Sequence, residues 1–252
     1  MIARSLRPFL LACQFLTVIP LPATATPDGE DIGQSSLYYP LIGLLLGLSL
    51  SATAYVSNLL FTHILSAVLV LTIWVILTGA LHLDGFADSV DGWAGGLGSG
   101  ERTLRIMKDP HCGPMAVTAL VLLLLIKAAT LAALLMLSGN LLLLLIPPVL
   151  ARLSILVLFL TTPYVRPLGL GEVLINHFPR RTALAICLLL PTFLLLAAFS
   201  LSLKIILVSG LSFLMLRRMM ITRIGGCTGD TTGALVEMLE VGVLLTMVAH
   251  YG

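Results

Sequence analysis

Charged side chains are scarce in this sequence, and their scarcity excludes a soluble fold. Only 10% of the 252 residues are Asp, Glu, Lys or Arg, whereas soluble domains carry about 25%. Hydrophobic residues make up 58%, and the mean hydropathy is +1.09. Such a chain cannot cover its surface with polar groups, so we predict an integral membrane protein. The net charge of +2 says little about partners, among which we expect no nucleic acid.

Other features that indicate particular classes are also missing. The apolar runs do not alternate with polar residues, which excludes the strands of a membrane β-barrel. No CxxC pair occurs, so we expect neither a disulfide framework nor a zinc site with paired ligands. A Gly-rich segment near the C-terminus lacks the Gly-Lys-Ser/Thr of a P-loop, and residues 1–22 show no clear signal-peptide cleavage site. The cysteines stand alone at Cys13, Cys112, Cys187 and Cys227.

Apolar runs bounded by charges or turn residues predict an all-α bundle of about seven transmembrane helices. A helix needs ~20 apolar residues to cross the hydrocarbon core. Residues 8–22 hold three prolines, so we predict an interfacial or re-entrant segment there rather than a span. Residues 1–252 are predicted to form a single membrane domain. The expected spans are about 37–57, 62–81, 113–137, 141–161, 182–200, 203–216 and 232–250.

The uneven distribution of basic residues orients the predicted bundle. With the N-terminus in the cytoplasm, eleven of the fourteen basic residues lie on the cytoplasmic side, and the opposite side holds only Lys204. Cytoplasmic loops carry an excess of Lys and Arg, which supports this orientation. The long polar segments then share the cytoplasmic face. These segments are 1–36, 82–112, 162–181 and 217–231.

Acidic residues collect at the same end of the bundle. All twelve lie in the cytoplasmic segments or, for Glu237 and Glu240, in the early part of the last span. A transporter would be expected to place ionisable groups near the bilayer midplane. The pattern therefore favours a membrane enzyme that takes polar substrates from the cytoplasm. Burial of Glu237 and Glu240 is costly, and a functional role or a partner such as Arg152 or Lys127 should offset that cost.

Three carboxylates, Asp84, Asp88 and Asp91, follow an uncharged stretch of 52 residues. On a helix their spacing places them within about 60° of one another on one stripe. Clustered carboxylates repel one another, and no Lys or Arg follows until Arg102. Their oxygen atoms suit Mg²⁺, which takes one or two carboxylates together with waters and phosphate oxygens. We favour a Mg²⁺ and phosphate site over a solvated helix end that carries acids by chance.

The segment after these carboxylates is basic. Arg102, Arg105 and Lys108 recur every three residues on one broad helical face, which we expect to end at Asp109 because Pro110 follows. This face is suited to binding phosphates, although positive loop charge alone explains it equally well. The neighbouring His82 lies off the carboxylate stripe, which favours a structural or hydrogen-bonding role, and it is kept among the substrate-binding candidates.

A second polar cluster, residues 223–240, is rich in glycine and hydroxyl side chains where it enters the last helix. Free backbone N–H groups in such a segment bind anions, which makes Gly226, Thr228 and Asp230 candidates for substrate binding. Glu237 joins them because it shares a face with Asp230 if the helix begins near residue 230. A Thr N-cap with an acid near the helix start also explains Asp230.

The turn-rich segment 161–172 contains Tyr164 and Arg166. These side chains are suited to contact a ring or a phosphate. A plain connector explains the segment at least as well.

Six segments together carry a resemblance to a known family. The most specific are "HLDGFADSVDG" (82–92) and "GDTTGALVE" (229–237), and the others are "FLTVIPLP", "YYPLIGLLLG", "ERTLRIMKDPHCGPMAV" and "PYVRPLGLG". In this order they resemble the cobalamin synthase family of adenosylcobinamide-GDP ribazoletransferases. The resemblance covers nearly the whole chain.

The resemblance implies a Mg²⁺-dependent phosphotransferase in the cytoplasmic membrane of a bacterium or archaeon. A hydroxyl of α-ribazole, or of its 5′-phosphate, would attack the cobinamide-linked phosphorus of adenosylcobinamide-GDP, a phosphodiester would form, and GMP would leave. Mg²⁺ on Asp84, Asp88 and Asp91 would bridge the two phosphates. Either Asp91 or Asp109 would accept the proton of the attacking hydroxyl.

The same resemblance implies roles for the basic face and the second cluster. Lys108, Arg102 or Arg105 would neutralise charge on the pyrophosphate. Asp230, together with residues 225–233, would hold the second nucleotide. Membrane lipid, other cobamide-assembly enzymes and a second copy of the chain are the further partners we consider.

Two alternative functions stay open from the sequence. One is an enzyme like the CDP-alcohol phosphotransferases, which also place several aspartates on membrane helices, although "DGFADSVDG" does not follow their usual spacing. The other is a transporter for a metal or a small solute.

Overall fold

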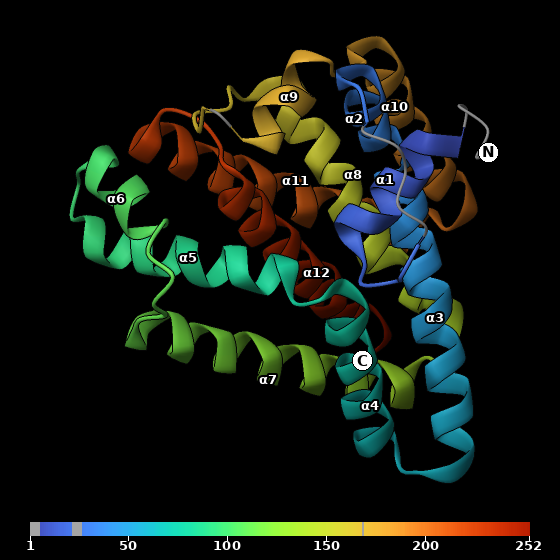
Figure 1. Ribbon diagram of the computed structural model, residues 1–252. Coiled ribbons are helices and arrows are strands. Elements are labelled where there is room, and N and C mark those ends of the chain that lie inside the picture. Colours follow the sequence, from blue (N-terminus) through green and yellow to red (C-terminus); the bar gives the residue numbers. More distant parts are fainter. Residues whose placement is uncertain (1–5, 22–26, 168) are drawn as a thin grey trace.

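The computed structural model describes residues 6–21, 27–167 and 169–252, and helices form nearly all of the ordered structure in these ranges. This confirms the all-α prediction. The only β-bridge within the described ranges joins Tyr164 to Cys227. In chain order, the helices shown in Figure 1 are α1 (Arg7–Leu16), α2 (Gly29–Ser35), η2 (Ser36–Tyr38), α3 (Tyr39–Leu60), α4 (His63–Thr78), α5 (Leu81–Gly96), α6 (Gly100–Ile106), α7 (Pro114–Leu137), η3 (Leu141–Leu145), α8 (Ile146–Thr161), α9 (Leu170–Asn176), α10 (Arg180–Ala197), α11 (Phe199–Ile224) and α12 (Gly229–Tyr251).

Six stretches of the described chain are long and apolar enough to cross a membrane. A seventh arises if α4 and α5 count as one span, although the two helices are bent by 87°. The chain is therefore a multi-pass membrane protein with close to the predicted number of spans. The six stretches are Gly29–Leu60, Pro114–Leu137, Leu141–Thr161, Arg180–Ala197, Phe199–Ile224 and Gly229–Tyr251.

The polar segments contain more helix than their composition predicts. Helices α5 and α6 occupy most of 82–112, and α11 continues through Ile224, so most of 217–231 is helical as well. Arg and Glu are good helix formers, which favours α6 and the end of α11. Helix α5 is rich in Gly and Asp instead, and it packs against α7 and α12. Helix α6 ends at Ile106, three residues before the end expected at Asp109.

The short helix α1 occupies much of segment 8–22. It has 10 residues, about half of what a span requires, which agrees with the prediction of a non-spanning segment as far as Leu21. Pro22 lies outside the described residues. The guanidinium of Arg7 lies 3.8 Å from the Asp31 carboxylate and so connects α1 to α2.

Helix α12 passes through the middle of the bundle and packs against α5, α7, α8 and α11 (Figure 1). In the most apolar 18-residue stretch of α12, 72% of the residues are buried, compared with 6% in that of α10. Buried side chains of α12 such as Leu235 and Val243 belong to two separate apolar clusters of the core. The central position of α12 lets its N-terminus meet several other elements.

A sharp corner joins α4 to α5. Both Gly79 and Ala80 have left-handed backbones, with φ of 60° and 57°. Glycine adopts this conformation freely, but for Ala80 it is strained. The corner turns α5 by 87° away from α4, and α5 then runs between α7 and α12 (Figure 1).

Candidate active site

Two close approaches between α5 and α12 position the site. A Cβ added at Gly85 would lie 2.7 Å from the carbonyl oxygen of Asp230, and one added at Gly233 would lie 3.1 Å from that of His82. Only glycine allows the first approach without displacing backbone. The N-terminus of α12 thus lies beside the part of α5 that carries Asp84.

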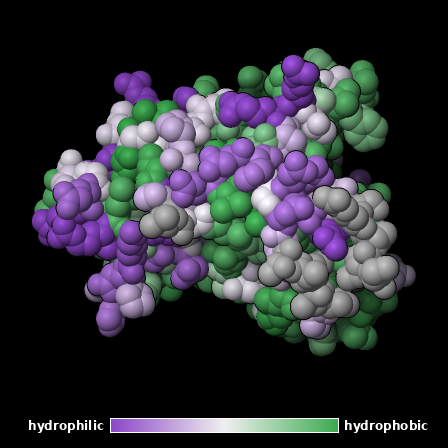
Figure 2. Space-filling view, turned by 45° about the horizontal axis from the view of Figure 1, so that its top comes forward, coloured by the Kyte–Doolittle hydropathy of each residue, from purple (hydrophilic) through white to green (hydrophobic). Residues whose placement is uncertain are grey.

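A cavity of about 310 Å³ opens where these two helices meet α8 and the segment before α9. Asp84 and His82 line it from α5, Asp230 lines it from α12, and Tyr164 and Arg166 line it from the segment between α8 and α9. Figure 2 shows hydrophilic side chains across one face of the molecule, with hydrophobic ones at its flanks. Three of the predicted site residues, His82, Asp84 and Asp230, therefore line one cavity.

The side-chain carboxylates of Asp84 and Asp88 form no hydrogen bond or ion pair with another described residue. Burial, followed by the negative charges of Asp230 and Asp84, raises the pKa of Asp88 to about 6. The positive charge of Arg166 opposes this shift, and Asp91 contributes least to it. The carboxylate that couples most strongly to Asp88 is therefore that of Asp230, from another helix.

Arg166 is the basic residue that lines this cavity. Its Nη2 lies 3.1 Å from Oδ2 of Asp230, although that oxygen is buried and accepts no hydrogen bond of acceptable geometry from a described residue. The two side chains therefore form an ion pair, and Oδ2 of Asp230 can still accept a hydrogen bond. Arg166 thus lines the cavity, and its contact with a phosphate stays a prediction.

Asp91 has a different environment from the other two aspartates of α5. Its Oδ2 accepts the backbone N–H of Gly113 at 2.5 Å, and its Oδ1 accepts that of Ala116 at 3.0 Å. These N–H groups belong to the first turn of α7, where no neighbour in the helix can accept them. Asp91 thus caps α7. Its predicted role as a metal ligand stays a prediction and would have to compete with these two bonds.

Within the described ranges, no group of three or more His, Cys, Asp or Glu side chains is arranged to hold a metal ion. A preformed cage of protein ligands is thus not present there. Mg²⁺ usually needs only one or two carboxylates, with waters and substrate phosphates completing the octahedron. Asp84 and Asp88, one helical turn apart and without protein partners, supply such a pair. The donor set therefore fits Mg²⁺ that binds together with a phosphate group.

The predicted basic face lies on the short helix α6 and the residues after it. Arg105 pairs with Glu101 at 2.8 Å, and Arg102 and Lys108 are exposed. Asp109 accepts hydrogen bonds from the His111 ring and backbone, which hold the pKa of Asp109 below its usual value. A lowered pKa makes Asp109 a weaker base. None of the four predicted residues Arg102, Arg105, Lys108 and Asp109 lines the cavity.

The glycine-rich entry to α12 is held by local structure. Thr228 is buried and forms a capping box with Thr231. Gly226 lies against the carbonyl of Pro163, where a side chain would collide. These contacts explain Gly226 and Thr228 structurally, and their binding of substrate stays a prediction.

A buried charge network lies deeper in the bundle. Lys127 of α7 donates to Glu237 and Glu240, each at 2.5 Å, and Arg152 of α8 donates to Glu240. The expectation that Arg152 or Lys127 offsets the two buried acids is therefore confirmed. Glu237, a candidate for substrate binding, is only 5% exposed and does not line the cavity. His82 connects the network to the cavity, with its Nδ1 3.4 Å from Nη2 of Arg152.

Sequence reasoning missed part of the cavity wall. Tyr39 and Leu16, which are distant in sequence from the aspartates, line the cavity beside Asp84. Both come from segments that carry the family resemblance, "YYPLIGLLLG" and "FLTVIPLP". Only that resemblance could have indicated these two residues, because an apolar or aromatic side chain within an apolar run does not stand out in the sequence.

Comparisons with known proteins give a consistent result. Residues 8–248 match the model of a family described as cobalamin-5-phosphate synthase. A protein of Pseudomonas putida (strain GB-1) named adenosylcobinamide-GDP ribazoletransferase is 49% identical over 238 residues, which cover 94% of this chain and 97% of that protein.

Two further proteins with the same name are similar over a comparable length. The one from Pseudomonas syringae pv. syringae (strain B728a) is 47% identical and covers 95% of this chain and 98% of its own. The one from Stutzerimonas stutzeri (strain A1501) is 45% identical, and the match covers 97% of this chain and 99% of that protein. No solved structure matches the chain.

Proposed function

The chain belongs to the cobalamin-5-phosphate synthase family, and from this membership we propose that it is an adenosylcobinamide-GDP ribazoletransferase. The match over residues 8–248 carries the proposal. In the reaction, a hydroxyl oxygen of α-ribazole or its 5′-phosphate forms a bond to the cobinamide-linked phosphorus. The bond from that phosphorus to the bridging oxygen breaks, GMP leaves with the bridging oxygen, and the hydroxyl proton passes to a base.

The charges around the cavity support a divalent cation as cofactor. Asp84 and Asp230 line it, and Arg166 lines it in an ion pair with Asp230. The negative charges of Asp84 and Asp230 also act on Asp88. An excess of carboxylates repels a diphosphate, so a bound anion needs additional positive charge. We propose that Asp84 and Asp88 hold Mg²⁺, which would supply charge neutralisation for the diphosphate and the departing GMP.

The chain's own residues then have separable tasks. Arg166, held by Asp230, offers a guanidinium to a phosphate oxygen within the cavity. The carboxylates shared by α5 and α12 supply the base for the hydroxyl proton, since Asp109 is a weakened base and both oxygens of Asp91 accept backbone N–H groups. The exposed Arg102 and Lys108 attract the anionic substrate from solution.

We further propose that the protein lies in the cytoplasmic membrane with this cavity open to the cytoplasm. Eleven basic residues in the polar segments against one on the opposite side support this orientation. The structure brings two of these segments into contact, because the Arg223 guanidinium donates to the hydroxyl of Thr103 at 3.0 Å. Segments 82–112 and 217–231 are thus in contact, as a shared cytoplasmic face requires.

The direct test is release of GMP from adenosylcobinamide-GDP by the purified protein in vesicles, with and without α-ribazole and Mg²⁺. We expect Asp84→Asn and Asp88→Asn to abolish turnover. The same variants should lose the increase in thermal stability that Mg²⁺ and a GDP-ester substrate together give the parent protein, since a ligand stabilises only the state that binds it.

A matched control is Glu30→Gln, which neutralises an exposed carboxylate on α2 and should leave turnover unchanged. Full activity of Asp84→Asn would contradict the metal assignment but not the reaction. Metal uptake into sealed vesicles, without GMP release, would instead support a transporter.

A further inference from the structure

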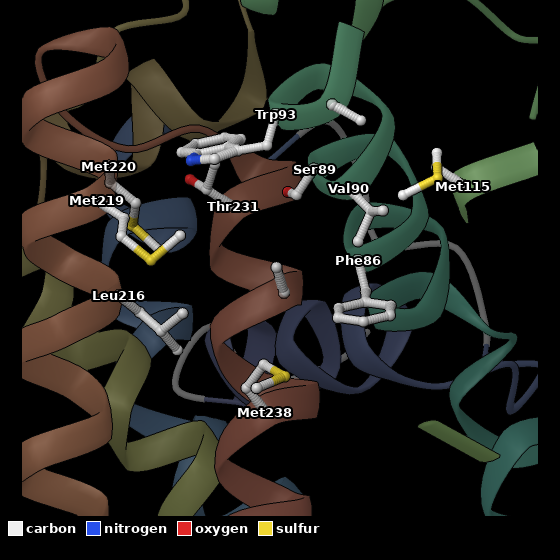
Figure 3. A pocket seen from close by; sticks show the side chains of 12 residues that line it. Phe86, Ser89, Val90, Trp93, Met115, Leu216, Met219, Met220, Thr231 and Met238 are labelled. Atoms are coloured by element: carbon white, nitrogen blue, oxygen red, sulfur yellow. The ribbon is translucent and has the colours of Figure 1, made fainter. Parts of the chain in front are cut away.

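A second cavity, of about 440 Å³, lies on the other side of the contact between α5 and α12. Helices α5, α11 and α12 enclose it, with Met115 from the start of α7 at its edge (Figure 3). We name it the methionine groove, because four of its lining residues are methionines: Met115, Met219, Met220 and Met238. Methionine side chains adapt to flexible apolar ligands.

The methionine groove is separate from the aspartate cavity. Its α5 residues, such as Phe86 and Trp93, lie on the face of that helix opposite Asp84 and Asp88, given about 100° per residue. The two cavities share no lining residue, and the helices approach each other closely where Gly85 meets the Asp230 backbone. The groove is therefore a separate site from the cavity that Asp84 and Asp230 line.

Hydrogen-bond donors are gathered at one end of the groove. Figure 3 shows Trp93 and Ser89 at this end, beside Thr231, and Met238 far from it. The Thr231 hydroxyl is already engaged in the capping box with Thr228. Ser89 is 8% exposed, and its Oγ has no hydrogen-bond partner. No hydrogen bond joins the indole N–H of Trp93 to another described residue either. Buried polar groups are normally paired, so the Ser89 hydroxyl indicates a ligand that offers an acceptor. The indole N–H of the half-buried Trp93 is available beside it.

A fixed positive charge lies at the same end. The guanidinium of Arg223 donates from Nη2 to the carbonyl of Trp93 at 2.7 Å and from Nε to the hydroxyl of Thr103 at 3.0 Å. Of the described residues that line the groove, none is charged, and Arg223 adjoins the groove through the Trp93 backbone. The groove therefore combines a polar end beside a fixed positive charge with an apolar remainder between Leu216, Phe86 and Met238.

We propose that the methionine groove binds one acyl chain of an anionic phospholipid. The ester and phosphate oxygens lie at Trp93, Ser89 and Arg223, and the chain extends along Leu216 toward Met238. Helices α11 and α12 are both long and apolar enough to span a membrane, so a lipid can enter the groove from the bilayer. Basic pockets between membrane helices recognise anionic headgroups in this way, and an indole at the membrane interface is well placed beside them.

The two tryptophans of the chain give a direct measurement. Trp74 is buried below Lys127, with the ammonium 4.7 Å from its ring centre, and Trp74→Phe leaves Trp93 as the only tryptophan. In nanodiscs, we expect brominated phosphatidylglycerol to quench the Trp93 fluorescence at an about fivefold lower lipid fraction than brominated phosphatidylcholine does. This ratio is the effect of one basic group near an anionic headgroup. The matched variant Trp93→Phe should show little quenching by either lipid.

Two further substitutions in the Trp74→Phe protein test the groove itself. Arg223→Gln should remove the preference for the anionic lipid. Ala234→Leu fills the groove from α12 and should reduce quenching by both lipids, whereas Ala129→Leu, the same change on an exposed position of α7, should not. If Trp74→Phe does not fold, native mass spectrometry of the parent, Ala234→Leu and Ala129→Leu proteins measures retained phosphatidylglycerol instead.

Two results would overturn the proposal. One is equal quenching of Trp93 by both brominated lipids with no effect of Ala234→Leu, which is the behaviour of ordinary boundary lipid. The other is protection of Trp93 by α-ribazole, which would make the groove a substrate site.

Discussion

The carboxylate of Asp91 accepts the backbone N–H of Gly113 at 2.5 Å, and this bond joins α5 to the first turn of α7. The same side chain accepts the N–H of Ala116. An acid at the N-terminus of a helix both pairs its free donors and complements its dipole. One of the three aspartates that the sequence groups together is therefore engaged in holding two helices in place.

Replacing Asp91 separates this structural role from a catalytic one. We expect Asp91→Ala to lower the free energy of unfolding by about 1–2 kcal/mol, as the loss of a helix cap does. Asp91→Asn keeps one acceptor oxygen and should retain most of the stability and turnover. Denaturant titration in detergent micelles and GMP release measure the two quantities. A stable but inactive Asp91→Asn protein would instead support the metal role that the sequence predicts.

The approach of α5 to α12 should be sensitive to a single methyl group. In Gly85→Ala the new Cβ would meet the Asp230 backbone at 2.7 Å, which would force the two helices apart and lower both stability and turnover. Gly210→Ala is the matched control, because nothing lies within 4 Å of its added Cβ. A helical Gly→Ala change without a clash stabilises by about 0.5–1 kcal/mol. Wild-type activity of Gly85→Ala would show that the contact is not required.

The raised pKa of Asp88 predicts a pH dependence of stability with a defined sign. Its pKa is about 6 in the folded protein, against 3.8 as the ordinary value, so the folded state holds this proton more tightly than the unfolded state. The ionised carboxylate therefore destabilises the fold, fully above pH 6 and progressively less toward pH 4. Asp88→Asn should melt at a higher temperature than the parent at pH 7.5, and the difference should shrink at pH 4.5. Measurements without Mg²⁺ and at constant ionic strength provide the comparison, and a pH-independent difference would contradict it.

The buried pair of Arg152 and Glu240 should behave cooperatively. Glu240→Gln leaves the guanidinium of Arg152 buried without its acid, which typically costs about 3–5 kcal/mol. Replacing both residues with Met removes both charges and should cost less than the sum of Arg152→Met and Glu240→Met measured singly, with a coupling of about 0.5–3 kcal/mol. A double-mutant cycle by denaturant titration measures this coupling. Additive effects would show that the two side chains act independently.

The sequence predicts much of the membrane architecture because hydrophobicity and charge asymmetry are local properties. The partners of the buried acids were also predictable, since two bases and two acids inside spans must meet. The corner at Gly79 and Ala80 was not predictable, because a left-handed alanine is disfavoured by itself and depends on its tertiary surroundings.

For the candidate site, the sequence identified Asp84, Asp88 and Asp230 but not how they are grouped. Helical spacing placed Asp91 with the first two, and the fold instead brings Asp230 against them through the close approach at Gly85. Contacts between helices that are more than a hundred residues apart in the chain leave no periodic signal in one sequence. Arg166 was ambiguous for the same reason.

The corner between α4 and α5 also fixes which way the aspartates face. Insertion of two residues after Ala80 would rotate α5 by about 200° about its own axis. The carboxylates would then turn toward the methionine groove, and Phe86 and Trp93 toward the aspartate cavity. Length changes at this corner should thus be far less tolerated than in the turn between α3 and α4, where Phe61 and Thr62 are exposed.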